Sequence, residues 1–344
     1  MKKLGRSYKN TLTLPAKYHL PPFVRGFIKR VLNTVSLYHL WEPKKCFIVA
    51  VSGGADSLCL LDILFLLAKK YSFALHVVHV NYRLRDKDSE NDERLVRKQA
   101  SAYGIPCSVL RPKINTKNNL EAKLRTLRYA FFEKIRKQEN YDLIAVAHNE
   151  DDQAETFLLR LLRGSGISGL ASMRPKNKYI IRPLIQMSRQ EIIRYLKERR
   201  IIHNEDISNQ DTKFLRNRVR HELLPFLEKK FQSKIKKILA TNASLLAEDY
   251  AFLNSLTAPL PSLKKSGKSI CFSCAEILSF PEPLVRYQLR ALFSPLLNSQ
   301  PPEKNLLNEA LKCLRSKKGK VQKFSFGGLK FIRKGDTVTL LISQ

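Results

Sequence analysis

The stretch Val49-Ala-Val-Ser-Gly-Gly-Ala-Asp-Ser-Leu58 decides how the first half of this chain folds. The apolar run 46–51 that leads into it is typical of a buried strand, and the leucine and isoleucine spacing after Ser57 is typical of a helix. Two adjacent glycines allow a sharp turn and a close approach of the backbone to a ligand. The stretch therefore predicts a strand, a tight glycine loop and a helix N-terminus in succession.

A helix N-terminus that follows a glycine loop is suited to bind phosphate. Its first N–H groups have no partner inside the helix and lie at the positive end of the helix dipole. The residues expected to bind a nucleotide here are Ser52, Gly53, Gly54, Ala55, Asp56 and Ser57. The loop is not a Walker loop, because no Gly-Lys-Ser/Thr follows it. The alternative is an ordinary turn between a core strand and a core helix.

Charge is the most unusual property of the composition. The 344 residues include 62 Lys and Arg against 30 Asp and Glu, which gives a formal net charge of +32. Because the excess is spread along the chain, it favours a folded basic surface that binds a polyanion such as nucleic acid. The alternative is a basic proteome, or basic residues that serve only solubility.

The six cysteines are typical of reduced thiols in a cytoplasm. Only Cys271 and Cys274 are closely spaced, and a lone pair of this kind is weak evidence for a metal site. No apolar run reaches the roughly 18 residues that span a bilayer, and no apolar segment follows the basic start as in a signal peptide. We therefore expect a cytoplasmic protein that does not enter a membrane.

Apolar strands and amphipathic helices alternate up to about residue 211. The strands are predicted over residues 46–51, 73–81, 107–110, 142–148 and 179–182. This pattern predicts an α/β fold, a Rossmann-like parallel sheet with helices on both faces. Ligands in such sheets bind at the carboxyl ends of the strands, where the Ser52 loop, Asn81 and the segment 148–152 would meet.

After about residue 211, long helical stretches replace this alternation. Three short strands are predicted at the end, over 321–326, 329–333 and 337–342. We therefore expect three parts: a basic N-terminal extension over 1–40, an α/β domain over 41–215, and a mainly helical C-terminal domain with a small β end over 216–344.

Acidic residues gather where the predicted strand 142–148 becomes a helix. Asp151, Asp152 and Glu155 follow the strand end within a few residues. Carboxylates at a helix start also simply favour the helix dipole. If these carboxylates face an anionic nucleotide, they would repel it unless a positive charge lies between them. They would then hold a hard divalent cation, which prefers oxygen ligands and phosphates, or bind an incoming ammonium group.

Two basic patterns accompany these acids. Glu121, Arg125 and Arg128 are spaced to share one face of a helix, where a solvated face with an ordinary ion pair is favoured over arginines directed at phosphate. Residues 212–240 contain nine Lys and Arg and two Glu, so this segment is either a surface that binds a polyanion or a linker with a basic helix start.

The glycine-rich segment 163–170 is either a mobile lid or a helix cap and turn.

In order and spacing, these segments resemble the tRNA(Ile)-lysidine synthetase family of PP-loop ATP pyrophosphatases. The matching pieces are Ser52–Ser57, His79-Val-Asn81, Glu121/Arg125/Arg128-Tyr129, His148–Thr156, Arg163–Gly166, Arg182-Pro-Leu184 and Glu205–Arg220. Residues 327–333 are similar to the family's C-terminal part more loosely. Tyr82 and Asn149 stand where many members have His, and the chain looks shorter than members with the longest two-part C-terminal extension.

The resemblance implies a ligase that modifies the wobble cytidine of an isoleucine tRNA with a CAU anticodon. The cytosine carbonyl oxygen would attack the α-phosphate of ATP and release pyrophosphate. The ε-amine of free L-lysine would then attack the ring carbon that carries this oxygen, and AMP would leave. Residues 41–215 would be the PP-loop ATP-binding catalytic domain, and residues 216–344 would bind tRNA.

The resemblance also implies roles for individual residues. Catalysis would involve Asp56, Arg125, Arg128, Asp151 and Asp152; Mg²⁺ would be held by Asp56 and Asp152; lysine would be bound by Asp151, Asp152 or Glu155; and tRNA would be bound by Arg216, Arg218 and Arg220. The alternatives are a PP-loop tRNA thiolase, which needs a reactive Cys or a cluster, and a nucleotide-sensing RNA-binding protein without catalysis.

Overall fold

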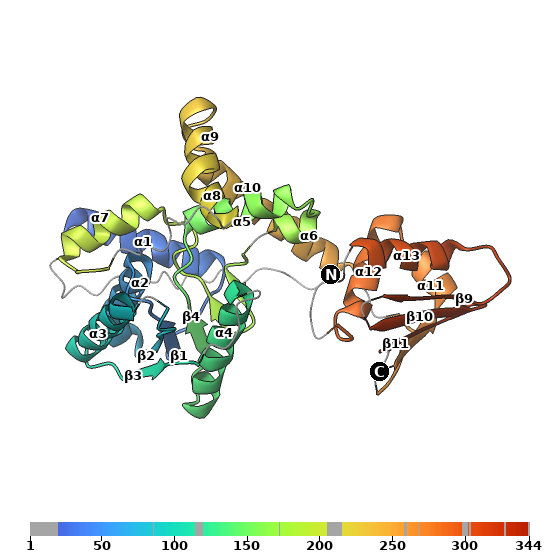
Figure 1. The fold of residues 1–344 in the computed structure, drawn as a ribbon, viewed down its shortest axis with the longest axis horizontal. Helices are drawn as coiled ribbons and strands as arrows, with labels where there is room; N and C mark the ends of the chain where they lie inside the picture. The colour runs from blue at the N-terminus through green and yellow to red at the C-terminus, as the bar shows by residue number, and fades with distance from the viewer. Residues whose placement is uncertain are drawn as a thin grey trace, which may run out of the picture. The chain divides into compact units, whose positions relative to one another are not determined.

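A six-stranded sheet in the order β3-β2-β1-β4-β6-β5 forms the centre of the first half of the chain (Figure 1). Its strands are β1 (Cys46–Ala50), β2 (Ala74–Val80), β3 (Cys107–Leu110), β4 (Leu143–Ala145), β5 (Lys176–Asn177) and β6 (Ile180–Ile181). Every neighbouring pair is parallel except β5 with β6. The predicted Rossmann-like parallel sheet is confirmed, although its fifth predicted strand shrinks to β6 and the short antiparallel β5 was not predicted.

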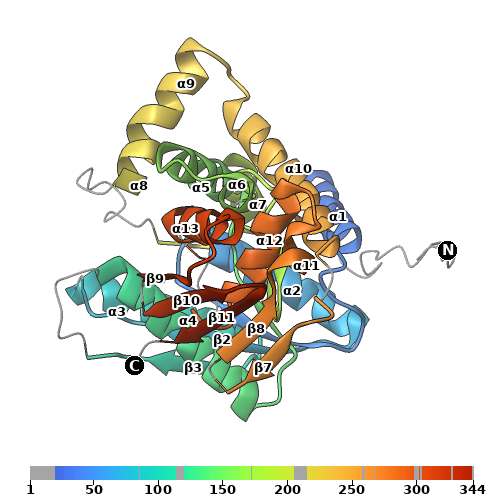
Figure 2. The same ribbon diagram turned by 90° about the vertical axis from the view of Figure 1, so that its right-hand side faces the viewer.

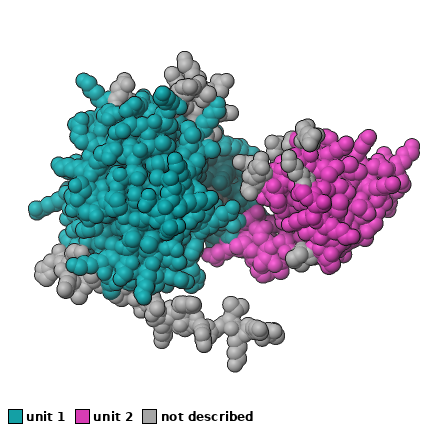
Figure 3. All heavy atoms as spheres, turned by 90° about the horizontal axis from the view of Figure 1, so that it is seen from below, with its two compact units in different colours: residues 1–247 teal, residues 248–344 magenta. Residues whose placement is uncertain are grey.

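The computed structural model describes residues 20–84, 86–113, 120–171, 173–204, 215–257, 260–267, 269–297, 302, 304–326 and 328–342. It divides the chain into two compact units, Met1–Ala247 and Glu248–Gln344 (Figure 3). Residues 1–19 of the extension predicted over 1–40, and the segment 205–214, lie outside the described residues. No helix in the described ranges is long and apolar enough to cross a bilayer.

Helices cover both faces of the sheet in the first unit. They are α1 (Pro22–Leu37), α2 (Ala55–Tyr71), α3 (Asp86–Ala102), α4 (Leu120–Gln138), α5 (Glu150–Leu162), α6 (Ile167–Leu170) and α7 (Arg189–Arg199). Successive side chains of a strand point to opposite faces, so Phe47 and Val49 pack with α1, α2 and α7, whereas Ile48 packs with Phe132 of α4. Helices thus pack on both faces of the sheet, and because its main strands are parallel, their carboxyl ends lie at one edge of it.

A further helical segment follows residue 214. It runs as α8 (Leu215–Arg218), a π-helical segment (Val219–Leu223) and α9 (Leu224–Lys230), and the chain then turns into α10 (Ile235–Ser255). Leu224 and Leu239 bury their side chains against Phe157 of α5. Because of this shared apolar cluster, the first compact unit extends to residue 247, beyond the boundary expected at 215/216.

The second unit contains a five-stranded antiparallel sheet in the order β7-β8-β11-β10-β9 (Figure 2). Its elements are β7 (Lys264–Ser266), β8 (Ser269–Ser273), α11 (Cys274–Leu278), α12 (Glu282–Phe293), α13 (Lys304–Arg315), β9 (Gln322–Phe326), β10 (Leu329–Lys334) and β11 (Thr337–Ile342). The helices and the small terminal sheet confirm the predicted class, and β7 and β8 extend the sheet beyond the three strands expected.

The two closely spaced cysteines have separate surroundings. The Cys271 sulfur lies beside the Thr339 hydroxyl, whereas the buried Cys274 thiol donates to the Leu314 carbonyl. Within the described ranges, no group of three or more His, Cys, Asp and Glu side chains is arranged to hold a metal. Cys274 belongs to the buried core of the second unit, and Cys271 lies on β8 opposite Thr339.

Candidate active site

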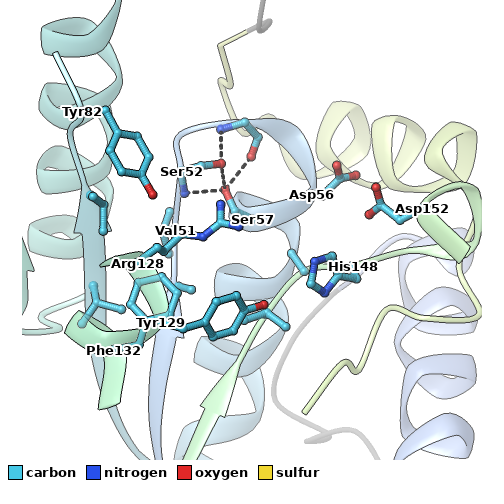
Figure 4. A pocket seen from close by; sticks show the side chains of 16 residues that line it. Val51, Ser52, Asp56, Ser57, Tyr82, Arg128, Tyr129, Phe132, His148 and Asp152 are labelled. Atoms are coloured by element: carbon cyan, nitrogen blue, oxygen red, sulfur yellow. Dashed lines mark hydrogen bonds between the residues drawn. The ribbon is translucent and has the colours of Figure 1, made fainter. Parts of the chain in front are cut away.

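A cavity of about 370 Å³ lies at the carboxyl ends of β1, β2 and β4 (Figure 4). The glycine loop after β1 forms one wall, and Tyr82, Arg128 and Tyr129 form another. His148 and Asp152, which follow β4, also line it. The sheet thus brings three segments together as the sequence predicted, because parallel strands end at the same edge.

Hydrogen bonds within the glycine loop fix its shape. The Ser57 hydroxyl donates to the Gly54 carbonyl at 2.8 Å and accepts the Ser52 N–H at 3.1 Å. The Ser52 hydroxyl lies 3.2 Å from it (Figure 4). Ser57 therefore organises the loop from within, while the exposed Ser52 and the N-terminus of α2 present donors toward the cavity.

Gly53 has a backbone conformation that requires glycine. Its φ angle is +96°, and a Cβ atom at this position would lie 3.2 Å from the Asp92 carboxylate and 3.3 Å from its Cβ. The Gly53 carbonyl accepts the Asn204 N–H at 3.2 Å, and the Asn204 side chain donates to Asp92 at 2.8 Å. The loop is therefore held against two other segments, which leaves its inner face open to a ligand.

Asp56 and Asp152 face each other across one side of the cavity (Figure 4). Asp56 accepts hydrogen bonds from Asn149 at 3.1 Å and from Arg189. Burial raises the pKa of Asp56; Arg189 lowers it and the Asp152 charge raises it, with a net increase. The site therefore holds an acidic pair that a positive charge between the two carboxylates would stabilise.

This donor set fits Mg²⁺. Two carboxylates from different elements lie beside a loop suited to phosphates, and Mg²⁺ is commonly held by one or two carboxylates together with substrate phosphates. Burial is the main cause of the raised pKa of Asp56, with repulsion from Asp152 added to it, and a cation would oppose both effects as Arg189 already does. Asp56 and Asp152 are the residues that would hold the ion.

The other predicted carboxylates make different contacts. Asp151 accepts the Arg189 backbone N–H at 2.9 Å and pairs with Lys236 at 3.1 Å. Glu155, only 2% exposed, pairs with Arg216 at 3.0 Å and with Arg220. The same two arginines also reach Asp152, at 3.2 and 3.4 Å. Arg216 and Arg220 thus anchor α8 and the π-helical segment to α5, whereas Arg218 is 59% exposed and pairs with Glu222.

The arginines of α4 approach the cavity from the opposite side. Arg128 lines the cavity, and both Arg125 and Arg128 lie over the Tyr129 ring, at 5.2 and 5.7 Å from its centroid. The side chain of Glu121 lies outside the described residues. Arg128 is therefore placed to meet an anion in the cavity, and Arg125 lies one turn earlier on the same helix.

His148 is held as a neutral hydrogen-bond donor. Its Nδ1 accepts from the Arg182 guanidinium at 3.0 Å, and because Arg can only donate, the imidazole proton is on Nε2. Burial and the charge of Arg182 keep the pKa of His148 well below its usual value. Arg182 in turn donates to the Arg174 carbonyl at 2.7 Å. His148 can therefore donate to a substrate oxygen, but it is a poor proton acceptor.

The two positions that depart from the family pattern both contribute to the site. Tyr82 lines the cavity and donates its hydroxyl to the Leu124 carbonyl at 3.0 Å. Asn149 caps α5, since its side chain accepts the Asp152 N–H at 3.0 Å while Asp152 accepts the Asn149 N–H. Asn is among the best N-cap residues, which accounts physically for an amide at this position.

Arg189 is the site residue that sequence reasoning missed. It begins α7, 133 residues from Asp56 in the chain, and pairs with it. The only local signal was the Ser188 cap, which marks a helix start but not a partner.

The glycine-rich segment 163–166 caps the end of α5: the Gly164 N–H donates to the Leu161 carbonyl, and the Ser165 N–H donates to the Arg160 carbonyl.

Comparison with known proteins agrees with this geometry. The model of the PP-loop domain family matches residues 26–227. Among curated tRNA(Ile)-lysidine synthases, that of Caldanaerobacter subterraneus subsp. tengcongensis is 37% identical over 235 residues, which cover 67% of this chain and 50% of the relative. That of Clostridium acetobutylicum is 32% identical over 301 residues, covering 85% of this chain and 65% of the relative.

The chain thus spans between 50% and 65% of the length of these two relatives. Among solved structures, the U34-tRNA thiolase NcsA from Methanococcus maripaludis, with its 4Fe-4S cluster, gives a TM-score of 0.56 at 18% identity. The match covers 66% of this chain and 79% of that one, and it is a likeness of fold.

Proposed function

The chain belongs to the PP-loop family of ATP-binding domains, and on this basis we propose that it is a ligase that joins free L-lysine to the wobble cytidine of tRNA(Ile) with a CAU anticodon. The similarity to curated tRNA(Ile)-lysidine synthases supports the assignment of lysine and of this tRNA as substrates. The observation that carries the proposal is the open N-terminus of α2, which shares one cavity with Asp56 and Asp152.

In the first step, the cytosine O2 attacks the α-phosphate of ATP, a P–O bond forms, and pyrophosphate leaves. The backbone N–H groups of the Ser52–Ser57 loop would hold the phosphates, and Arg128 would stabilise negative charge on the attacked phosphorus. Mg²⁺ held by Asp56 and Asp152 would neutralise charge on the polyphosphate. Positioning and charge neutralisation are the main demands of an in-line transfer, and this cavity offers both.

In the second step, the lysine ε-amine attacks C2 of the adenylated base, the C–O bond breaks, and AMP leaves. The amine must lose a proton, and a carboxylate of the Asp151, Asp152 and Glu155 group would bind the ammonium and accept it. Asp152 lines the cavity, whereas Glu155 lies behind it under Arg216 and Arg220. Of this group, Asp152 is therefore the carboxylate that an incoming ammonium would reach, and it would accept the proton only when it does not hold Mg²⁺; Glu155 would position it through the shared arginines.

The tRNA would meet a strongly basic protein. Arg218 is exposed and lies beside Arg216 and Arg220, so it is the member of this trio best placed to contact a phosphate. Substrate would therefore approach the side of the first unit where α8 and α9 stand over α5 (Figure 1).

The test is incubation with ATP, radiolabelled lysine and each of the two CAU-anticodon tRNAs. The proposal expects lysine-dependent AMP release and label in tRNA(Ile) but not in tRNA(Met). Asp56→Asn should abolish both signals while tRNA binding survives. Glu198→Gln, on α7 and not among the residues that line the cavity, is the matched control. If the protein releases AMP but no radiolabelled lysine enters the tRNA, the assignment of lysine as substrate is wrong.

The thiolase alternative makes a different demand. A thiolase would show a thiolated base and bound iron or sulfur. The cysteine of α2, Cys59, is fully buried against the core, and burial raises the pKa of its thiol well above the usual value. A buried, protonated thiol is a poor nucleophile, so the site chemistry favours the ligase.

A further inference from the structure

An exposed aromatic pair lies at the tip of the α9–α10 hairpin, away from the cavity. Phe226 is 51% exposed and Phe231 is 72% exposed, and their ring centroids lie 5.6 Å apart in an edge-to-face arrangement. In two perpendicular views α9 continues from α8 and points away from the sheet, and the chain turns back at its tip into α10 (Figure 1, Figure 2). We call Phe226 and Phe231 the tip pair.

The tip pair is not needed for the core of this hairpin. Other apolar side chains of the same segment supply that core: Leu224 packs with Leu239 and Ala243, and Leu227 packs beside them. Leaving two phenylalanine rings in water costs hydrophobic free energy, on the order of 25 cal/mol per Å² of apolar surface. Two adjacent exposed rings, beyond those that the fold uses, point to a ligand that covers them.

The turn that carries the tip pair is fixed. The N–H groups of Phe231 and Gln232 both donate to the Leu227 carbonyl, at 3.0 and 2.9 Å. The Gln232 side chain then accepts the Lys234 N–H at 3.2 Å, and the Ile235 N–H donates to the Gln232 carbonyl. The rings are therefore presented on an ordered turn, which lowers the entropic cost of binding.

Positive charge surrounds the pair. Lys229, Lys230, Lys234 and Lys237 are exposed around the turn. The two acids of the segment 215–238 already have partners, Glu222 with Arg218 and Glu228 with Lys236. The local field therefore favours a polyanionic partner.

Aromatic faces combined with lysines fit single-stranded or looped RNA, whose unstacked bases stack on such rings while its phosphates meet the cations. We propose that the tip pair is an RNA-stacking platform, with Lys229, Lys230 and Lys234 as its phosphate contacts. The proposal rests on the proposed function only for the identity of the RNA, a CAU-anticodon tRNA. Its occupant is a base of that tRNA outside the nucleotide cavity.

The experiment measures tRNA binding without ATP or lysine, by fluorescence anisotropy, over a series of salt concentrations. Replacing both rings, Phe226→Ala with Phe231→Ala, should weaken binding at least about fivefold, the lower end of what one stacked base contributes. The slope of log affinity against log salt should not change. Lys229→Gln with Lys230→Gln should instead reduce that slope, by about one for each phosphate that the variant no longer neutralises.

Two controls make the result specific. Phe252→Ala removes a ring that is 63% exposed on α10 but outside the turn, and it should leave affinity unchanged. Phe226→Leu with Phe231→Leu keeps an apolar surface without a ring face. If the leucine variant binds tRNA as well as the wild type, a ring face is not needed and the stacking proposal is wrong. If the alanine variant alters the oligomeric state, the proposal is also wrong and the face is a contact between protein chains.

Failure of this inference and failure of the proposed function are distinguishable. With saturating tRNA, the alanine variant should turn over at the wild-type rate, so the defect appears in KM and not in kcat. A wild-type protein that binds tRNA but incorporates no lysine would contradict the ligase and leave the stacking test intact. Wild-type tRNA affinity in the alanine variant would overturn the platform, whatever the activity.

Discussion

The Asn149 side chain donates a hydrogen bond to Asp56 at 3.1 Å while its amide oxygen caps α5. One residue therefore joins the N-terminal turn of α2 to that of α5. Both helices direct their positive ends toward the same cavity, so the capping residue that starts one helix also orients the carboxylate of the other.

Replacing Asn149 should separate these two roles. Asn149→Ala removes the cap and should lower the free energy of unfolding by about 1 kcal/mol, within the range for N-cap deletions. Asn149→Ser keeps a capping oxygen but loses the amide donor to Asp56, so it should retain stability and lose activity. Denaturant unfolding and AMP release measure the two effects. Ser188→Ala, which removes the equivalent cap of α7, is the matched control for stability.

Gly53→Ala should disable the loop. A non-glycine residue at φ +96° carries strain of about 1–3 kcal/mol, and the new Cβ would press on Asp92. Gly104→Ala provides the control, because Gly104 also has a positive φ, +66°, but open space around it. We expect ATP binding, measured by calorimetry, to be lost in the first variant and kept in the second. Equal ATP affinity in both would contradict the close packing of the loop.

Glu93 should make the free energy of unfolding depend strongly on pH in the acid range. Burial opposes its ionisation, but hydrogen bonds from Arg97, Asn81 and Arg111 outweigh this and lower the pKa of Glu93 to about 2. A depressed carboxyl pKa stabilises the folded state above the unfolded pKa of about 4.5, and this contribution is lost as pH falls toward 2.

Glu93→Gln should therefore destabilise the protein at pH 7 by roughly 2 kcal/mol, a value reduced for the partial exposure of the arginines. The difference from the wild type should shrink between pH 4.5 and pH 2. Urea unfolding at several pH values measures it. A difference that is constant with pH would show that the Glu93 charge contributes no stability.

Arg220 and Arg218 should behave differently although they lie two positions apart. Arg220→Ala leaves Glu155, which is 2% exposed, without one of its two partners and should cost roughly 2–3 kcal/mol of folding free energy. Arg218→Ala should change stability by less than about 0.5 kcal/mol and should lower the salt dependence of tRNA binding. Thermal unfolding and salt-dependent tRNA binding would show whether the two arginines differ in this way.

The sequence was sufficient where the signal is local. The glycine loop after β1 and the periodicity of the strands determine the sheet, and the parallel arrangement then requires Ser52, Asn81 and His148 to share an edge. Strand β8, by contrast, is a short alternating segment next to a turn, which sequence patterns do not distinguish from a loop. It becomes a strand because β11 pairs with it.

Contacts between distant residues were not predictable in this way. Arg189 was overlooked because its partner Asp56 lies on another helix, far away in the chain. The assignment of Arg216 and Arg220 to tRNA rests on the charge of their segment and on the family resemblance, and neither shows which cations have buried partners. Their roles as tRNA contacts remain predictions, and the ion pairs with Asp152 and Glu155 are the contacts that they make within the fold.

The ion pairs of Arg216 and Arg220 with Glu155 fix α8 and the π-helical segment, which continue into α9, against α5. The tip pair lies near the end of α9, which is part of the same helical segment. The ion pairs that Asp152 and Glu155 make beside the cavity therefore also hold the start of the segment that carries the tip pair.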